Sequence, residues 1–283
     1  MKPNLIAGAV IALGAFGAFA DAESAELKTS LSAQAEDFAI NNVTTSLYHE
    51  FGHLLIDQYE WPILGREENA ADTIMTMLLL DERTPEAAEI AADAVRGYLK
   101  ASERYGETLP PNQDFYGEHE LEVQRGLMMA CILVGTDRTT FEPLAHEVDM
   151  GDERIEDCAE SSRLHQRSWA AMKDTVTATQ FSAAAHGRRA SPAPSFAIVY
   201  DDPGERYAPI AALMRERRLL ETVAEKLTAR FPLRRPATMR ATLCDDDDAY
   251  YDEESDEISL CYEYVQFYYD LIADPAHAGE GMI

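Results

Sequence analysis

The chain has 283 residues, of which 51 are Asp or Glu and 24 are Lys or Arg, so its formal net charge is −27. This charge excludes nucleic-acid binding through a basic surface, because affinity for phosphates comes from clustered Lys and Arg side chains. Hydrophobic residues make up 46% of the chain and aromatic residues 9%. That apolar content supplies a core and excludes intrinsic disorder, which combines high charge with low hydrophobicity.

Residues 1–22 have the pattern of a signal peptide. Lys2 gives a positive start, Leu5 to Ala20 is an uncharged apolar run, and small residues allow cleavage after Ala20 or after Ala22. The alternative is an N-terminal membrane anchor. No later stretch reaches the roughly 18 apolar residues of a membrane span. We therefore expect an exported protein, periplasmic or secreted, with no stable membrane span after cleavage.

The chain has four cysteines, Cys131, Cys158, Cys244 and Cys261. An even number of cysteines in a chain bound for an oxidising compartment indicates disulfides. Neighbours in sequence close the shortest loops, which predicts the pairs Cys131–Cys158 and Cys244–Cys261. The alternative is a zinc site of four thiolates, but the chain has no Cys-x-x-Cys pair to support it.

Apolar residues at helical spacing predict a series of helices in residues 23–186. These helices are expected at 37–59, 66–80, 84–105, 121–134 and 163–178. Thr84 can cap the third of them, with Pro85 in its first turn. Residues 187–195 are rich in proline and small residues, which indicates a linker or loop.

Residues 196–283 have a different character, with short β-type runs around one long amphipathic stretch. The expected order is a strand at 196–200, a helix at 207–231, a strand at 237–244, a hairpin with arms at 245–251 and 257–262, and a helical tail at 264–272. The predicted fold class is therefore α+β: a mostly helical region followed by a small α/β module with a disulfide-clamped hairpin.

The segment His49-Glu50-Phe51-Gly52-His53 carries the strongest chemical signal. His49 and His53 stand four apart, so on a helix both imidazoles project from one face within reach of one metal ion. Glu50 is placed to hold a metal-bound water and accept its proton, which is the zinc-hydrolase arrangement. The alternative, two histidines without a metal on an apolar helix face, requires a buried hydrogen-bond partner for each ring.

A third ligand is expected from the next helix, because catalytic zinc usually takes three protein ligands. Glu68 and Asp72 stand four apart there, and the turn 61–65 folds this helix back beside the first. Glu68 is predicted to bind the metal and Asp72 to accept the other ring N–H of a ligand histidine. The alternative is that Glu67 and Glu68 only stabilise the helix N-terminus, which does not explain Asp72 inside an apolar helix.

His-Glu-x-x-His followed by Glu-x-x-Ala-Asp resembles the gluzincin metallopeptidases. The fuller runs at 47–53 and 64–72 resemble a bacterial family of exported metallopeptidases long labelled a domain of unknown function. Further matching motifs at 119–125 and 244–263, together with the inner cysteines, extend the resemblance over nearly the whole mature chain. One departure is Asp248-Ala249-Tyr250-Tyr251, where the family usually has Asn-Ala-Phe-Tyr.

The mechanism implied is metal-assisted hydrolysis of a peptide or protein substrate. Zinc lowers the pKa of its bound water toward about 7, and Glu50 passes the proton to the leaving amine. His119 and Arg125 are the candidates for stabilising the oxyanion, the alternatives being a surface histidine and an ordinary helix ion pair. Two other functions stay open: a non-catalytic or regulatory metal-binding protein, and a metal hydrolase of a non-peptide amide.

The order of elements differs from zincin folds, in which a β-sheet normally precedes the His-Glu-x-x-His helix and its edge strand lines the substrate cleft. Too few mature residues precede Asp37 to form that sheet. We hypothesise a zincin-like core in permuted order, with the C-terminal module folded back so that residues 248–251 lie beside His49 and Glu50. The alternative is a separate β-domain remote from the metal.

Overall fold

The computed structural model describes residues 14–105, 118–185 and 195–273. In these ranges the chain first forms six helices, and then four strands and three more helices. The first six are α1 (Gly14–Tyr59), α2 (Glu67–Glu82), α3 (Pro85–Tyr105), α4 (Glu122–Thr136), α5 (Arg138–Glu147) and α6 (Asp152–Ala185). The rest are β1 (Phe196–Tyr200), α7 (Gly204–Glu216), α8 (Leu219–Arg230), β2 (Ala237–Thr242), β3 (Ala249–Asp252), β4 (Glu257–Cys261) and α9 (Tyr262–Ala273). The predicted α+β class is confirmed.

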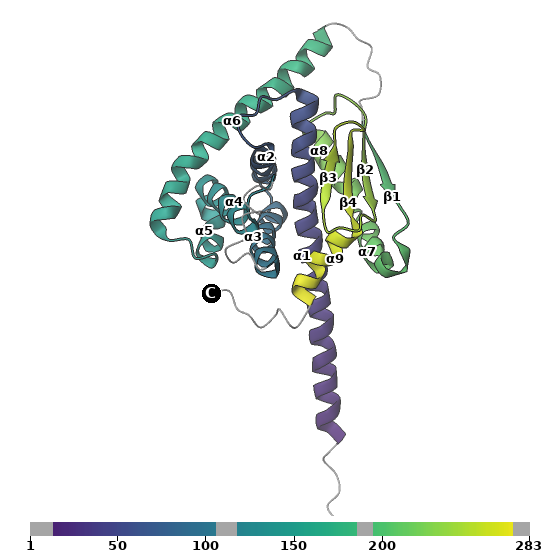
Figure 1. Ribbon diagram of the computed structural model, residues 1–283. Helices are drawn as coiled ribbons and strands as arrows, with labels where there is room; N and C mark the ends of the chain where they lie inside the picture. The colour runs from purple at the N-terminus through teal and green to yellow at the C-terminus, as the bar shows by residue number, and fades with distance from the viewer. Residues whose placement is uncertain (1–13, 106–117, 186–194, 274–283) are drawn as a thin grey trace, which may run out of the picture.

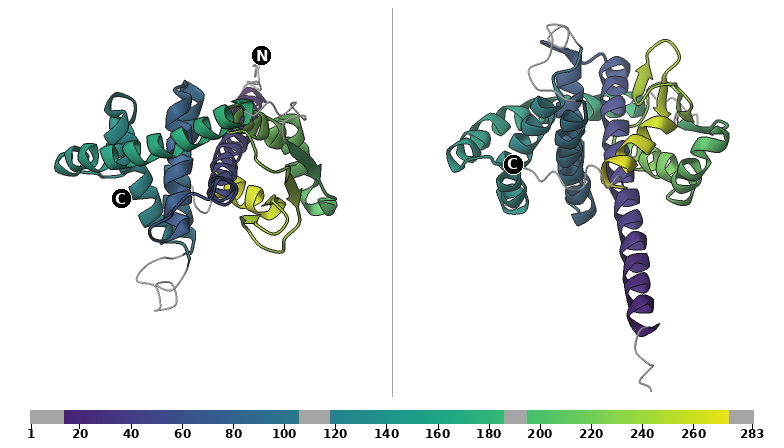
Figure 2. Two further views of the ribbon diagram at one scale, coloured as in Figure 1. Left: turned by 90° about the horizontal axis from the view of Figure 1, so that it is seen from above. Right: turned by 60° about the horizontal axis from the view of Figure 1, so that its bottom comes forward.

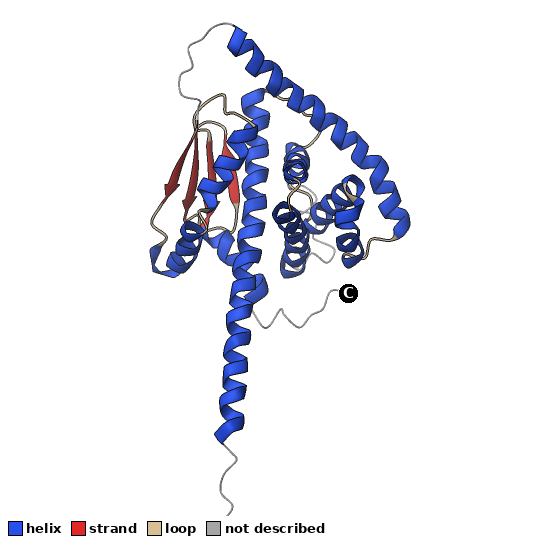
Figure 3. Cartoon of the chain, turned by 180° about the vertical axis from the view of Figure 1, so that it is seen from behind, coloured by secondary structure: helices blue, strands red, loops and turns tan. Residues whose placement is uncertain are grey.

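Helix α1 is the axis of the molecule. Helices α2 to α5 lie on one side of it and the sheet lies on the other, while α6 runs along the outside of the helical half (Figure 1). The view from behind shows the same division (Figure 3). Because α1 is covered on both sides, its residues Leu47, Tyr48, Phe51, Leu54 and Leu55 have no exposed surface. The candidate histidines therefore project from a part of α1 that is covered on both sides.

The sheet has the strand order β1-β2-β4-β3. Strands β1, β2 and β4 are parallel neighbours, and β3 pairs with β4 in the predicted antiparallel hairpin. Helices α7 and α8 connect the parallel strands β1 and β2, as a parallel pair requires a crossover. Helix α9 packs against α1, where the rings of Tyr268 and Phe38 have centroids 6.4 Å apart. Further views show the sheet and its helices beside α1 (Figure 2).

The observed elements differ from the predicted ones at several boundaries. Helix α1 begins at Gly14, because residues 22–36 contain neither Pro nor Gly and are rich in helix-forming Ala and Glu. The predicted helix 207–231 is two helices, since Arg218 adopts the left-handed conformation with φ 49°. Helix α5 was not predicted, although Asp137 marks its start by accepting a hydrogen bond from the Thr140 amide.

Two predictions fall partly or wholly outside the described residues. Residues 1–13 of the expected signal peptide lie outside them, and both expected cleavage positions fall within α1. The expected linker also lies outside them, except for its last residue, Ser195. Among the helices that are described, none is long and apolar enough to cross a membrane.

The two disulfides are those predicted from the order of the cysteines. Cys131–Cys158 joins α4 to α6, with the two Cα atoms 5.1 Å apart. Cys244–Cys261 joins the segment after β2 to the end of β4, at a Cα separation of 5.5 Å. The second bond fixes one end of the loop that precedes β3, which matters for the site below.

Helices α1 and α2 approach closely at Gly52. A Cβ atom built on Gly52 would lie 3.2 Å from the Cα of Ala71 and 3.3 Å from its carbonyl oxygen. Both contacts are to backbone, which cannot rotate away as a side chain can. The absence of a side chain at position 52 therefore lets α2 lie against the histidine-bearing face of α1, and it brings Glu68 and Asp72 beside that face.

Candidate metal centre

The three residues predicted as metal ligands meet at one point between α1 and α2. The Nε2 atoms of His49 and His53 are 3.1 Å apart. The Oε2 atom of Glu68 lies 3.0 Å from Nε2 of His49 and 3.3 Å from Nε2 of His53. The helical repeat places both rings on one face of α1, and the close approach at Gly52 places Glu68 opposite them.

His119 adds a fourth donor from the segment before α4. Its Nε2 atom lies 2.7 Å from Oε2 of Glu68. His49, Glu68 and His119 form a group that could hold a metal ion, with ligand atoms within 4.8 Å of one another. A hydrogen bond of 3.1 Å from the Asn69 side chain to Glu120 ties this segment to α2. From the sequence, His119 is predicted only as a residue that stabilises the oxyanion. Its contact with Glu68 makes it a possible metal ligand as well.

Asp72 fixes the orientation of His49. Its Oδ1 atom lies 2.7 Å from Nδ1 of His49, and Arg125 donates to both of its oxygens at 2.8 and 2.9 Å. Burial alone would raise the pKa of Asp72, but Arg125 and His49 hold that pKa well below its ordinary value. An ionised Asp72 only accepts hydrogen bonds. Nδ1 of His49 therefore donates, and Nε2 faces Glu68.

Glu67 orients the ring of His53 in the same way that Asp72 orients His49. Its Oε1 atom lies 2.9 Å from Nδ1 of His53. From the sequence, Glu67 is not assigned to the site, since a carboxylate in the first turn of a helix is explained by the helix N-terminus alone. Its pairing with His53 depends on how α2 is rotated against α1. No feature of the sequence specifies that rotation at this position.

The converging atoms call for a cation. With both Nδ1 atoms donating to carboxylates, the two Nε2 lone pairs and Oε2 of Glu68 are three acceptors facing one another. Donor atoms around a tetrahedral zinc at its usual bond lengths lie about 3.3 Å apart, close to the 3.0–3.3 Å found here. When no ion is bound, a proton takes the place of the cation: burial would lower the pKa of His49, but Asp72 and Glu68 raise it to about 10, because their negative charges favour a positive charge at this point. The donor set therefore fits a divalent metal.

Glu50 is the buried carboxylate beside this centre. It is 6% exposed, and no residue in the described part of the chain donates a hydrogen bond to its carboxylate. It lines a pocket of about 330 Å³ together with His49, His119 and Arg125. Burial raises the pKa of Glu50 to about 7. A carboxyl group with such a pKa can both accept and release a proton near neutral pH.

The C-terminal module forms the opposite wall of this pocket. Asp248 and Ala249, at the start of the hairpin, line it together with His49 and Glu50. This is the contact that the folded-back arrangement requires. The remote β-domain considered as the alternative does not describe this fold, because β3 and β4 also pack directly on α1.

Arg125 has a different position from the one expected of a free oxyanion donor. Its Nε and Nη2 atoms bond to Asp72, its Nη1 atom lies 3.2 Å from Glu122, and its guanidinium lies 4.7 Å from the centroid of the Tyr98 ring. Arg125 thus positions Asp72 and, through it, His49. Oxyanion stabilisation by His119 or Arg125 stays a prediction.

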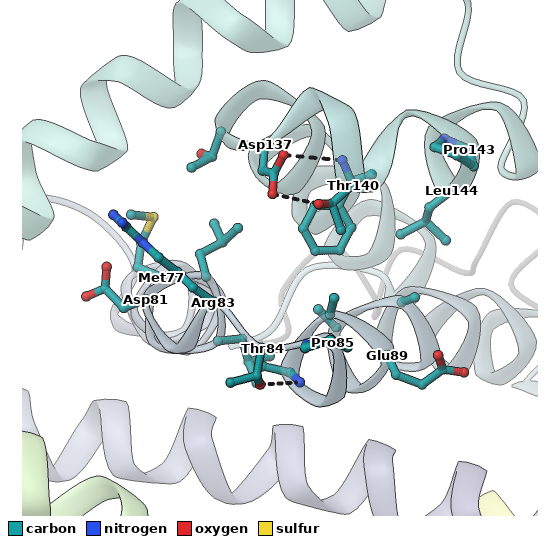
Figure 4. Close-up of a pocket in the computed structure, with 18 of the residues that line it drawn as sticks. Met77, Asp81, Arg83, Thr84, Pro85, Glu89, Asp137, Thr140, Pro143 and Leu144 are labelled. Atoms are coloured by element: carbon teal, nitrogen blue, oxygen red, sulfur yellow. Dashed lines mark hydrogen bonds between the residues drawn. The ribbon is translucent and has the colours of Figure 1, made fainter.

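A larger cavity of about 970 Å³ lies between α2, α3, α5 and α6. Figure 4 shows it between Asp81, Thr84 and Thr140, where Thr84 caps α3 as predicted by accepting from the Ala87 amide. No histidine is among the residues that line it. Of these two pockets, only the smaller one is lined by residues of the candidate metal centre.

The chain is thus an α+β protein in which two central helices bring together histidine and carboxylate side chains that could bind a metal. It matches the family model DUF4344, described as "Putative metallopeptidase", over residues 14–172 and 200–281. These segments make up more than half of the chain, and the chain belongs to this metallopeptidase family. No curated protein and no solved structure matches it.

The close helix approach gives a first prediction. Gly52→Ala should weaken zinc binding by about tenfold, the lower end of the usual effect of disturbing the groups around a metal ligand, because the new methyl group requires the α2 backbone to shift by a few tenths of an ångström and moves Glu68 relative to the histidines. An ordinary Gly to Ala change inside a helix would instead stabilise it. Competition with a chromophoric chelator measures the affinity, and Gly151→Ala, where the methyl group meets no atom within 4 Å, is the control. Unchanged zinc affinity with a raised melting temperature would contradict this prediction, because α2 would then accommodate the methyl group without disturbing the metal ligands.

The support of His49 gives a second prediction. Arg125→Met should weaken zinc binding by about 10- to 100-fold, the usual effect of removing a group that orients a metal ligand, because Asp72 loses the cation that keeps it ionised. Arg96→Met breaks a similar two-pronged ion pair, with Glu147 at 2.7 and 2.8 Å, away from the centre. Equal zinc affinities in the two variants would contradict this role for Arg125.

Proposed function

We propose that the protein is an exported zinc-dependent endopeptidase in which His49, His53 and Glu68 hold one zinc ion and Glu50 is the general base. Membership of the metallopeptidase family supports the reaction class. Two imidazoles and one carboxylate are the ligand set of known catalytic zinc sites, which supports zinc as the metal. The two disulfides are compatible with an oxidising compartment, which supports export.

The observation that carries the proposal is the position of Glu50 next to the converging ligand atoms. Its carboxylate is buried, has no hydrogen-bond partner in the described chain and lines the same pocket as His49. A bound zinc ion would supply the Lewis acidity that makes a water molecule acidic and polarises a carbonyl group. Glu50 accepts the proton of that water at a carboxylate oxygen and delivers it to the nitrogen of the leaving amine.

The other residues of the pocket have supporting parts. Asp72 and Glu67 keep the two histidine rings in the orientation that a metal requires. His119 is 44% exposed at its side chain and lines the pocket, so it can reach a bound substrate. Its ring N–H is suited to donate to the carbonyl oxygen as negative charge develops there.

The test is made on mature protein produced in an oxidising compartment. We expect stoichiometric zinc by elemental analysis, and cleavage in a broad peptide library that a chelator abolishes and added zinc restores. Bound zinc without any cleavage would favour a non-catalytic metal-binding protein. Cleavage confined to non-peptide amides would favour a different hydrolase. Absence of bound metal under zinc-replete conditions would overturn the proposal.

A further inference from the structure

The pocket beside Glu50 has an acidic wall. Asp246, Asp247 and Asp248, in the loop between β2 and β3, all line it. Asp246 and Asp248 each accept a hydrogen bond from the main-chain amide of the next residue, and neither forms an ion pair with a described basic residue. The loop begins at the Cys244–Cys261 disulfide, which holds it on the site.

The same pocket contains buried polar groups without partners. Glu50 and Tyr98 are each 6% exposed, and neither side chain makes a hydrogen bond in the described chain. Buried polar groups normally have partners, because leaving one unpaired after its removal from water costs free energy. In the proposed mechanism Glu50 pairs with the attacking water, so Tyr98 is the buried group that a substrate would satisfy. A donor to its phenol oxygen would do so, and this observation is independent of the acidic loop.

The positive charges of the pocket are already balanced. Arg125 lines it, but its guanidinium bonds to Asp72 and Glu122. The Nε2 atom of His119 contacts Glu68. The carboxylates of Asp246 and Asp248 therefore leave the pocket with an excess of negative charge, which adds to the negative charge of the whole chain and attracts cations.

The third wall is aromatic. Tyr264, Phe267 and Tyr268 of α9 line the pocket beside Tyr98. Aromatic faces attract ammonium and guanidinium groups and also accommodate the methylene chain that carries them. A pocket of about 330 Å³ is of the size that holds one small ligand or one long side chain.

From these observations we propose that the pocket binds a positively charged group of the substrate next to the bond that is cleaved, so that the enzyme acts on cationic peptides. This inference rests on the proposed peptidase function and adds its substrate class. An ammonium or guanidinium group fits the loop carboxylates, the aromatic faces and the phenol oxygen of Tyr98 at once. Such a group belongs to a Lys or Arg side chain in an endopeptidase; a free peptide N-terminus in its place would make the enzyme an aminopeptidase.

The test uses decapeptides of neutral sequence, acetylated and amidated, with one Lys scanned along the chain and a norleucine counterpart for each. Norleucine keeps the methylene chain and removes the charge. We expect kcat/KM for the best lysine peptide to be roughly tenfold above that of its norleucine counterpart. A second set with free N-termini distinguishes the two sources: a preference for the free amine over lysine assigns the pocket to the N-terminus.

The double variant D246N/D248N should reduce the lysine to norleucine ratio at least about fivefold. Asparagine keeps the shape and the side-chain oxygen that accepts the main-chain hydrogen bond. The matched control, E253Q/E254Q, makes the same change of charge in the hairpin turn, at exposed residues that do not line the pocket, and should leave the ratio unchanged. The single variant D246N, at an exposed residue, repeats the measurement should the double variant misfold.

Equal turnover of lysine and norleucine peptides by the wild type would overturn this inference and leave the peptidase function standing. So would a preference that survives in D246N/D248N. If no peptide is cleaved, calorimetry with the zinc-loaded protein measures binding of the same peptides. If the lysine peptide binds more tightly and this preference is lost in the double variant, the pocket binds a cationic group although the peptidase function fails. Equal binding of the two peptides would contradict both the cation-binding pocket and the peptidase function.

Discussion

Replacing Glu68 with alanine should remove most of the zinc from the purified protein, with an affinity loss of more than about 100-fold, beyond that of a merely orienting residue. The reason is that Oε2 of Glu68 is the common neighbour of His49, His53 and His119. Burial would raise the pKa of Glu68, but the three histidines hold it well below its ordinary value. Without this anion, the three imidazoles that remain as ligands carry no negative charge to balance a divalent ion directly.

The measurement is metal content after dialysis, followed by competition with a chelator of known affinity. Glu67→Ala is the matched control, because this residue is on the same turn of α2 but contacts only the far nitrogen of His53. We expect a smaller loss there, about 10- to 100-fold. Full zinc occupancy in Glu68→Ala would remove Glu68 from the ligands and leave His119 as the partner of the two helix histidines.

The ligands of α1 and α2 could be predicted because they depend only on local periodicity. Residues four apart share a helix face, and the short connection at 61–65 forces α2 back along α1. His119 is different, since no repeat relates it to Glu68 and its position depends on how the segment before α4 crosses α2. The pairing of Arg125 with Asp72 is non-local in the same way. The sequence therefore pointed to Arg125 as a site residue but could not predict that it bonds to Asp72.

The fold likewise has local features that could be predicted and non-local features that could not. The hairpin β3–β4 joins neighbours in sequence and could be predicted, whereas the parallel pairing of β2 with both β1 and β4 depends on crossovers that no local pattern specifies. The break between α7 and α8 rests on one residue, Arg218, in a conformation that Arg adopts rarely. A periodic apolar pattern continues across that break, and it therefore predicts a single helix.

Glu50→Gln should retain zinc and the native fold while hydrolysis falls by about 10²- to 10⁴-fold, the usual contribution of a general base. The amide has the shape of the carboxylate but cannot accept the proton of the attacking water. Burial disfavours the charged form of Glu50, as its pKa raised to about 7 indicates. The neutral amide therefore removes an unfavourable burial, and the melting temperature of the variant should be no lower than that of the wild type.

Activity, zinc content and melting temperature are measured on the same preparation, so that loss of catalysis is separated from loss of metal or of fold. Glu60→Gln is the matched control, because it makes the same chemical change at an exposed residue just beyond the end of α1. We expect this control to behave as the wild type in all three measurements. Cleavage by Glu50→Gln at the wild-type rate would mean that another group takes the proton, and the mechanism proposed for this site would be wrong.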